Sequence, residues 1–425
     1  MQCRLLFLAP FALALLLSCG KKKEENEEPA PPPVATSANG TAGSATQPTS
    51  SWYRIEIEAE AGNVPFMLEV HLPLQPSSIA TVANGAERIS RTMTCEGVKC
   101  VVDFSVFGSK LVLDFTKETE PVGEWSLSEY YPGNTLSVVG VAVKGSGSAY
   151  RYLRTEEPAV DVSGKWVLDI KGVGPGKAEF VQHEDGTVQG WIVPTNIGDV
   201  RYLDGRVSGD TVQLSTFDGQ HAYNVQLEVA ADGKTLEGVW HYHKFWHYEM
   251  TGWRGKEPTL GELHTIRLKP GLTKLSLSEL DALKGRPVIL DFYGTWCSTC
   301  MDLMPVLVDL YARYKDQGLV VYSIAFEPSD DAELVKKQVE LFEDKYGITW
   351  ESSTRDVDDL EVIFEQLENT EGFPMTFFVN RDGTLQGLHS GFVSPAAAEE
   401  HAKLLEKYEA LTKQILASKV RARVP

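Results

Sequence analysis

The sequence predicts a multidomain protein in which an N-terminal all-β region, an antiparallel sandwich or barrel, precedes an α/β domain. From Trp52 to about Gly255, polar and apolar residues alternate as in Trp166–Ile170, and Asn-Gly or Asp-Gly turn signals recur at short spacing. Past Pro258 the pattern changes to a nearly unbroken apolar run, 287–293, followed by a helical stretch. The 425 residues, 43% of them hydrophobic, are enough for two or three domains.

Residues 1–18 have the features of an export signal. Arg4 precedes an apolar run, and Leu16-Leu17-Ser18-Cys19 resembles the lipobox of bacterial lipoproteins. The resemblance implies that Cys19 carries a lipid anchor, so that the membrane is a partner. No Asp follows Cys19, which implies the periplasmic face of the outer membrane. An ordinary secretory signal with an incidental cysteine is the alternative.

Residues 19–50 are predicted to be a disordered tether, because their charged, Pro-rich and Ser-rich composition cannot bury enough apolar surface to fold. The β region divides into domain 1, residues 51–157, and domain 2, residues 158–256, unless the two merge into one unit. A possible seam lies near Glu156-Glu157-Pro158. The α/β domain is expected to cover residues 259–425.

Within the α/β domain, each element follows from its own pattern. Strands are expected at 286–293 and 319–326, and helices from the end of the first strand through Tyr314, at 332–346 and around 360–367. Two strands flank Asp382-Gly383, and a last helix begins near Ser394-Pro395.

Charge and composition exclude some functions. The formal net charge of −19 argues against nucleic acid as a partner, because phosphate binding requires a basic surface. Beyond the first 20 residues, no segment is apolar for long enough to span a bilayer. No cofactor motif is evident, and we expect none.

The strongest chemical signal is Trp296-Cys297-Ser298-Thr299-Cys300, where the apolar strand changes to a helix. At a helix N-terminus, free backbone N–H groups and the macrodipole stabilise a thiolate, so the pKa of Cys297 should fall from about 8.5 to near 7 or below. Cys300 lies one helical turn further on, where it can form a disulfide with Cys297. Half of a zinc site or an inert structural disulfide are alternatives. Neither explains the position at a strand-to-helix junction, and we expect no metal.

Residues 291–300 with Pro305 resemble the active-site strand and helix of thioredoxins, most closely those of the exported TlpA/ResA-type thiol–disulfide oxidoreductases of the AhpC/TSA-redoxin group. Two further motifs match in order: Gly372-Phe373-Pro374-Met375-Thr376, which resembles the segment that carries the family's cis-proline, and Asn380-Arg381-Asp382-Gly383. The resemblance covers roughly residues 260–420. It implies a thioredoxin-like fold, a redox-active Cys297–Cys300 pair, and substrate contacts with Trp296, Phe373, Pro374 and Met375.

Asp291 corresponds to the family's buried acid, six residues before the first cysteine. A buried carboxyl between Leu290 and Phe292 should have a raised pKa, which would suit it to exchange a proton with Cys300. An Asp that reaches water at a strand end is the alternative. The residues Ser298-Thr299 between the cysteines, and Met304 where many relatives have Glu, depart from the pattern and leave the direction of electron flow open.

Two other groups could carry chemistry. Cys95 and Cys100 flank a four-residue loop and are predicted to form a structural disulfide, with redox exchange with Cys297 and Cys300 as the alternative. His241, His243 and His247 suit a metal site by spacing, but the surrounding aromatic residues favour an ordinary strand pair.

The leading functional hypothesis is therefore thiol–disulfide exchange, in the direction of disulfide reduction, with exported proteins as clients and a membrane-side electron donor or acceptor as partner. A peroxiredoxin-like thiol peroxidase is a second hypothesis. It is weakened by Gly294, because the peroxidase pattern has Thr or Ser three residues before its cysteine. A non-enzymatic binding lipoprotein is the third.

Overall fold

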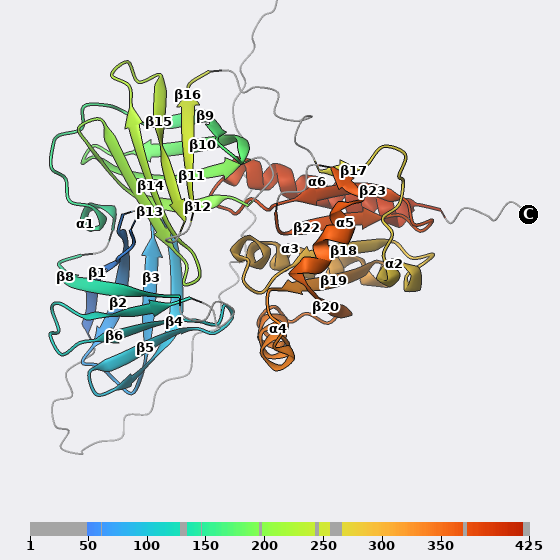
Figure 1. Cartoon of the computed structure of the whole chain (residues 1–425), viewed down its shortest axis with the longest axis horizontal. Coiled ribbons are helices and arrows are strands. Elements are labelled where there is room, and N and C mark those ends of the chain that lie inside the picture. Colours follow the sequence, from blue (N-terminus) through green and yellow to red (C-terminus); the bar gives the residue numbers. More distant parts are fainter. Residues whose placement is uncertain are drawn as a thin grey trace, which may run out of the picture. The chain divides into compact units, whose positions relative to one another are not determined.

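The computed structural model describes residues 49–60, 62–127, 134–145, 147–194, 198–242, 246–255, 266–368 and 372–419. It contains two closed eight-stranded antiparallel β-barrels, followed by a mixed α/β domain of the thioredoxin type (Figure 1). The predicted fold class is confirmed. The proposed signal peptide, Cys19 and almost all of the tether lie outside the described residues.

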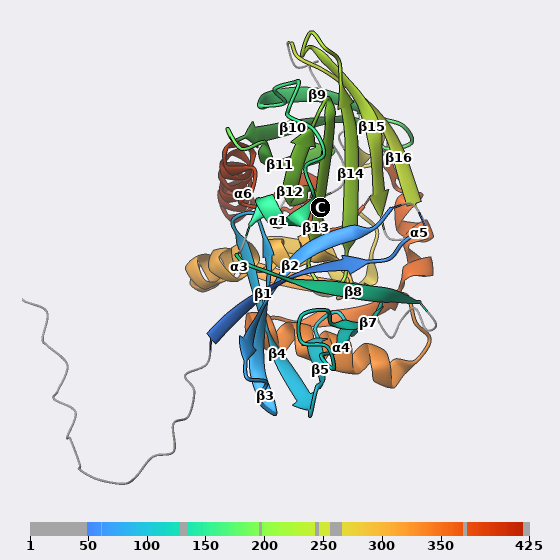
Figure 2. The ribbon, with the colours of Figure 1, turned by 90° about the vertical axis from the view of Figure 1, so that its left-hand side faces the viewer.

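The first barrel, drawn in blue to teal in Figure 1, is a meander in which each strand pairs with the next. The last strand returns to pair with the first, from Trp52–Val143 to Ile57–Val138, and so closes the barrel (Figure 2). Inward-facing aromatic residues such as Tyr53, Phe66 and Trp125 fill the interior. The strands are β1 (Thr49–Ile57), β2 (Val64–Leu72), β3 (Ser77–Asn84), β4 (Glu87–Glu96), β5 (Lys99–Phe104), β6 (Ser109–Asp114), β7 (Val122–Ser126) and β8 (Thr135–Val143).

The second barrel, in green to yellow, repeats this plan, and its first strand pairs with its last. The Asp185-Gly186 and Asp232-Gly233 signals both form turns of antiparallel hairpins, as the sequence predicted. Its strands are β9 (Gly164–Ile170), β10 (Gly174–Gln182), β11 (Thr187–Pro194), β12 (Val200–Ser208), β13 (Thr211–Phe217), β14 (Ala222–Val229), β15 (Thr235–Tyr242) and β16 (Trp246–Trp253).

The tip of the β13–β14 hairpin inserts into the core of the first barrel. Phe217 is fully buried and its ring stacks on Phe66, with a centroid distance of 4.3 Å. The carbonyl of Gly219 accepts a hydrogen bond from the Trp125 indole at 2.9 Å. A Cβ at position 219 would lie 2.1 Å from the Phe104 ring, so this close approach requires glycine. Apolar packing therefore joins the two barrels.

A short helix, α1 (Ser148–Arg151), connects the barrels and contributes a fully buried guanidinium. Arg151 donates to Asp204 at 3.2 Å in the second barrel, and to the carbonyls of Pro65 and Ala83 at 3.0 and 2.5 Å in the first. A buried charge is tolerated when it is paired and its donors are used, and these contacts meet that condition.

The α/β domain, in orange to red, has a five-stranded sheet of order β20-β19-β18-β22-β23. The first three strands are parallel and the last two antiparallel. A separate two-stranded sheet pairs β17 with β21. The strands are β17 (Arg267–Leu268), β18 (Val288–Tyr293), β19 (Val320–Glu327), β20 (Ser352–Asp356), β21 (Leu367–Glu368), β22 (Met375–Val379) and β23 (Leu385–Ser390).

Helices cover both faces of this sheet, as the apolar run 287–293 predicted. Every residue of β18 is buried, and alternate residues face opposite sides. Ile289 and Tyr293 pack in one cluster with residues of α3, α4 and α6, whereas Leu290 packs in the other with residues of α2 and α5. The helices are α2 (Ser278–Ala282), α3 (Ser298–Tyr314), α4 (Ala332–Tyr346), α5 (Leu360–Phe364) and α6 (Ala398–Ala417), with 3-10 turns η1 (Lys315–Gln317) and η2 (Val357–Asp359).

The sequence prediction matches α3 and α4 at their ends, but α6 begins later than predicted, at Ala398. The residues after Ser394 form a turn instead, in which the Ala397 N–H donates to the Ser394 carbonyl at 3.2 Å. No helix among the described residues is both long and apolar enough to cross a membrane.

Replacing Phe217 with Ala should loosen the joint between the barrels. Removal of a fully buried ring leaves a cavity, and we expect the free energy of unfolding to fall by about 3–5 kcal/mol. Urea-induced unfolding followed by circular dichroism measures it. Val181→Ala, at a residue of the same barrel that is 52% exposed, should change stability by less than about 0.5 kcal/mol. Equal effects of the two substitutions would contradict the packing role.

Candidate active site

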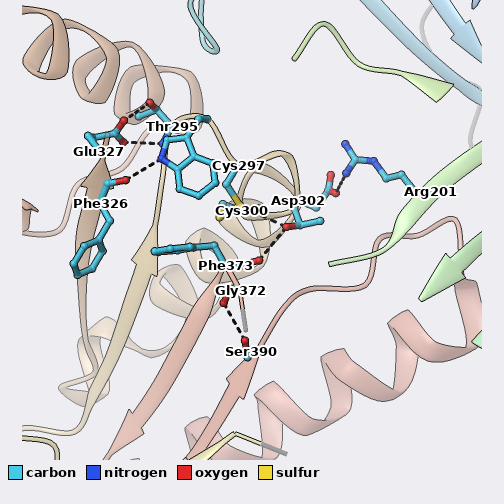
Figure 3. The surroundings of a disulfide bond; sticks show 12 residues. Arg201, Thr295, Cys297, Cys300, Asp302, Phe326, Glu327, Gly372, Phe373 and Ser390 are labelled. Atoms are coloured by element: carbon cyan, nitrogen blue, oxygen red, sulfur yellow. Dashed lines mark hydrogen bonds and ion pairs between the residues drawn. A yellow bond between two sulfur atoms is a disulfide. The ribbon is translucent and has the colours of Figure 1, made fainter. Parts of the chain in front are cut away.

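Cys297 and Cys300 lie at the N-terminus of α3 and form a disulfide, with their Cα atoms 5.3 Å apart (Figure 3). Cys297 is the N-cap residue, and its sulfur accepts a hydrogen bond from the backbone N–H of Cys300 at 3.1 Å. The Thr299 hydroxyl lies 3.5 Å from the same sulfur. In the reduced protein the Cys300 N–H, with the helix dipole, would stabilise a thiolate on Cys297.

The loop before Cys297 is held by the end of β19. The backbone N–H of Thr295 donates to Oε1 of Glu327 at 2.8 Å, and the Thr295 hydroxyl donates to Oε2 at 2.9 Å. The Trp296 indole donates to the carbonyl of Phe326 at 2.9 Å. The ring of Trp296 also meets that of Phe373 edge-on, with a centroid distance of 5.4 Å. Trp296 therefore has a defined position beside the cysteines.

The segment before β22 lies against the cysteine motif. The Phe373–Pro374 peptide bond is cis. The Thr299 hydroxyl donates to the carbonyl of Phe373 at 3.3 Å, and the Ser390 hydroxyl donates to that of Gly372 at 3.0 Å. Met375, the next residue, is buried at the start of β22. Trp296 and Phe373 thus lie beside the cysteine motif, whereas Met375 packs with Leu290 in the cluster on the other face of the sheet.

Asp291 is fully buried on β18, on the face that also carries Ile289 and Tyr293 and that packs against α3. Burial raises its pKa well above the usual value, and the hydroxyl of Ser323 opposes this rise only partly. The structure therefore does not favour the alternative of an Asp that reaches water. A protonated carboxyl beneath the cysteine-bearing helix is what a proton exchange with Cys300 would require.

Three residues of the second barrel, Gly198, Asp199 and Arg201, contact the same region. A Cβ on Gly198 would lie 2.0 Å from Cγ2 of Thr299, so the barrel backbone touches the residue between the cysteines. Asp199 accepts hydrogen bonds from the Ser394 backbone N–H and hydroxyl at 3.1 and 2.6 Å. Arg201 forms an ion pair with Asp302 of α3 at 2.6 Å (Figure 3).

This ion pair belongs to a largely buried charged group. Arg201 also lies 3.6 Å from Glu87 of the first barrel, so its guanidinium faces carboxylates from two other domains. Burial raises the pKa of Asp302 to about 7, although the positive charge of Arg201 opposes this. Burial likewise raises the pKa of Glu87, and the positive charge of Arg201 again opposes this rise. The sequence analysis missed these residues because nothing in their spacing connects them.

The disulfide borders a cleft of about 510 Å³. One wall comes from the α/β domain, with Cys297, Trp296 and Phe373, and the other comes from the end of the second barrel. His221 also lines this cleft, and its Nδ1 lies 3.0 Å from Oδ2 of Asp218. Tyr242, in the strand pair that the sequence indicated around His241, lines the wall as well, together with Trp240 and Tyr248.

The remaining candidates lie elsewhere. Cys95 and Cys100 are directly opposed on β4 and β5 and form a disulfide, with their Cα atoms 4.0 Å apart. Glu96 and Lys99 also pair, so the connecting loop is shorter than predicted. The rings of His241 and His247 are 6.3 Å apart, whereas His243 lies outside the described residues.

A mixed sheet with a CxxC disulfide at a helix N-terminus, next to a cis-proline segment, defines a thioredoxin-like domain. The comparisons agree: residues 265–388 match the model of the AhpC/TSA family. The C-terminal part of the chain is thus an AhpC/TSA thioredoxin-like domain, related at low identity to thiol–disulfide oxidoreductases.

Thiol-disulfide oxidoreductase ResA of Oceanobacillus iheyensis is 32% identical over 119 residues, which are 27% of this chain and 55% of that protein. Thioredoxin-like protein YneN of Bacillus subtilis is 29% identical over 127 residues, or 30% of this chain and 69% of that protein. The chain therefore spans little more than half the length of the first relative. A crystal structure of a putative DsbE from Chlorobium tepidum is 19% identical and covers 35% of this chain and 97% of that chain, with a TM-score of 0.26.

Replacing Asp291 with Asn should change how stability depends on pH. The folded protein keeps the Asp291 proton, whereas the unfolded chain releases it above about pH 4, so the wild type loses stability as pH rises through that window. We expect the free energy of unfolding of the wild type, compared with that of Asp291→Asn, to fall by up to about 1.4 kcal/mol per pH unit until the pH reaches the folded-state pKa of Asp291. Urea unfolding of the oxidised proteins at a series of pH values measures this. Parallel curves would show that Asp291 is not protonated in the folded state.

Replacing Arg201 with Met should destabilise the protein by about 3 kcal/mol, because Glu87 and Asp302 would lose their cation in a largely buried place. Adding Glu87→Gln and Asp302→Asn should restore much of the loss. Arg313→Met removes ion pairs with Asp309 and Glu409 in which the Arg side chain is 43% exposed, and should cost less than about 1 kcal/mol. The same urea titration tests all three proteins, and equal losses at both sites would refute the role of Arg201.

Proposed function

We propose that this protein is a thiol–disulfide oxidoreductase that reduces disulfides of exported proteins. The observation that carries the proposal is the Cys297–Cys300 pair at the start of α3, beside the Pro374 segment and open to a cleft. The relationship of the C-terminal domain to thiol–disulfide oxidoreductases supports it.

In the first step, the Cys297 thiolate attacks one sulfur of a client disulfide. The client S–S bond breaks, a mixed disulfide forms between the client and Cys297, and the second client sulfur leaves as a thiolate that takes a proton from water. The hydrogen bond from the Cys300 N–H stabilises the attacking thiolate.

In the second step, Cys300 attacks the sulfur of Cys297. The mixed disulfide breaks, the client leaves as a dithiol, and the Cys297–Cys300 disulfide forms, so that two electrons have passed to the client. Cys300 must first lose its proton, and an ionised Asp291, buried on the strand face beneath α3, is the proposed acceptor; the protonated Asp291 of the oxidised protein is then the state after this transfer. A dithiol donor at the membrane then reduces the disulfide again.

We also propose the setting of this reaction. The lipobox-like sequence ending at Cys19 supports a lipoprotein anchored to the periplasmic face of the outer membrane. In an oxidising compartment, misplaced disulfides need a reductant, which fits the proposed direction.

Reduction of insulin disulfides by the full-length protein, with a thiol reductant as electron source, tests the proposal. We expect the wild type to accelerate reduction and Cys297→Ser to leave the uncatalysed rate, because the attacking sulfur is missing. Cys300→Ser should instead accumulate a mixed disulfide with the client, detectable by mass spectrometry, because the resolving sulfur is missing.

Two outcomes would overturn the proposal. Equal insulin reduction by the wild type and Cys297→Ser would place the activity elsewhere. Consumption of hydrogen peroxide that needs Cys297 but not Cys300 would favour the thiol peroxidase. Measuring the reduction potential of the pair against glutathione fixes the direction of electron flow.

A further inference from the structure

The cleft beside the disulfide has two walls of different origin. The α/β domain supplies Trp296 and Phe373, and the end of the second barrel supplies four aromatic rings from β14, β15 and β16. These six aromatic residues, which we call the aromatic walls, are Tyr223, Trp240, Tyr242, Tyr248, Trp296 and Phe373.

The barrel wall is attached to the catalytic domain by the residues described above. Gly198 touches Thr299, Asp199 is hydrogen-bonded by Ser394, and Arg201 is paired with Asp302. The contacts with Thr299 and Asp302 hold this segment against the N-terminal half of α3, and the contact with Ser394 holds it against the turn before α6. The wall is therefore part of the reactive site and not a neighbouring surface.

This arrangement restricts how a client reaches the sulfur. Cys297 is only 5% exposed and Cys300 is fully buried, so a client sulfur has to approach Cys297 through the cleft. A volume of about 510 Å³ is that of a small-ligand pocket. It admits a few side chains of an extended segment, but not the surface of a folded domain.

The charged groups that line the cleft further restrict which client segments can enter it. Its lining contains the carboxyl of Asp199 and the imidazole of His221, but no Lys or Arg among the residues that the structure describes. One carboxylate oxygen of Asp199, Oδ1, is buried without a hydrogen-bond partner, and so is the indole N–H of Trp240. An acidic side chain entering here would lose its hydration without meeting a Lys or Arg in the lining.

We infer that the second barrel is a specificity element. Together with the α/β domain it selects extended polypeptide segments in which an aromatic side chain neighbours the reacting cysteine and no acidic side chain does. The aromatic walls supply ring–ring contacts to the client side chain, and a lining without Lys or Arg disfavours a client carboxylate. The inference rests on the proposed function, because it concerns the clients of the same dithiol.

Peptides that differ at one position test this. Each carries one cysteine as a mixed disulfide with thionitrobenzoate, preceded by Trp, Ala or Glu. When the reduced full-length protein is added, Cys297 attacks the peptide sulfur, and release of the coloured thiolate is followed by stopped flow. We expect the Trp peptide to react about five- to tenfold faster than the Ala peptide, and the Glu peptide to react slowest. Glutathione with the same leaving group should also react more slowly than the Ala peptide.

Variants of the barrel wall assign the preference to the barrel. Tyr242→Ala should reduce the ratio of the Trp to the Ala rate to below about twofold, because one ring of the wall is lost. Tyr242→Phe keeps the ring and should keep the ratio. Trp253→Ala is the matched control, since Trp253 is 37% exposed on β16 and does not line the cleft. It should react with every probe as the wild type does.

The outcomes separate the two proposals. If the wild type releases no thiolate from any probe faster than Cys297→Ser does, the proposed function fails. If it reacts but the Trp, Ala and Glu rates are equal, or if the ratio survives in Tyr242→Ala, the function stands and the inference is overturned. Glutathione reacting as fast as the Trp peptide would likewise overturn it, in favour of a small-molecule substrate.

Discussion

The ion pair between Arg201 and Asp302 is the contact on which the geometry of this site depends. Its guanidinium comes from the second barrel, its nearest carboxylate from the helix that carries both cysteines, and a further carboxylate, Glu87, from the first barrel. A buried cation is costly unless it is paired, and here the pairing requires three domains to meet at one point. These ion pairs hold the second barrel against the α/β domain, and the cleft beside the disulfide lies between the two.

Apolar packing supports the same arrangement. Phe217 enters the core of the first barrel, while His221 and Tyr223, only a few residues further along the β13–β14 hairpin, line the cleft. The two ends of this hairpin tip therefore serve different purposes, one for stability and one for the site. Hydrophobic burial is not directional, whereas the ion pair fixes an orientation, so the two interactions complement each other.

Local patterns were enough to predict the chemistry, but not its surroundings. Cys297 and Cys300 could be placed at a helix N-terminus because the apolar strand before them and the spacing of the motif are both local signals. Alternation in the β region showed which residues face inward, but not which strand closes a barrel or which barrel end meets another domain. Arg201 and Asp302 are far apart in sequence, and no periodicity relates them.

The contact between Gly198 and Thr299 has a consequence for how the redox properties of this protein can vary. In CxxC proteins the two residues between the cysteines are the usual place for tuning. Here Thr299 is packed against a barrel backbone that has no room even for a methyl group at position 198. A bulkier residue at 299 would have to displace a whole domain. A change at Thr299 therefore calls for a matching change in the barrel loop at Gly198, because the two residues pack directly against each other.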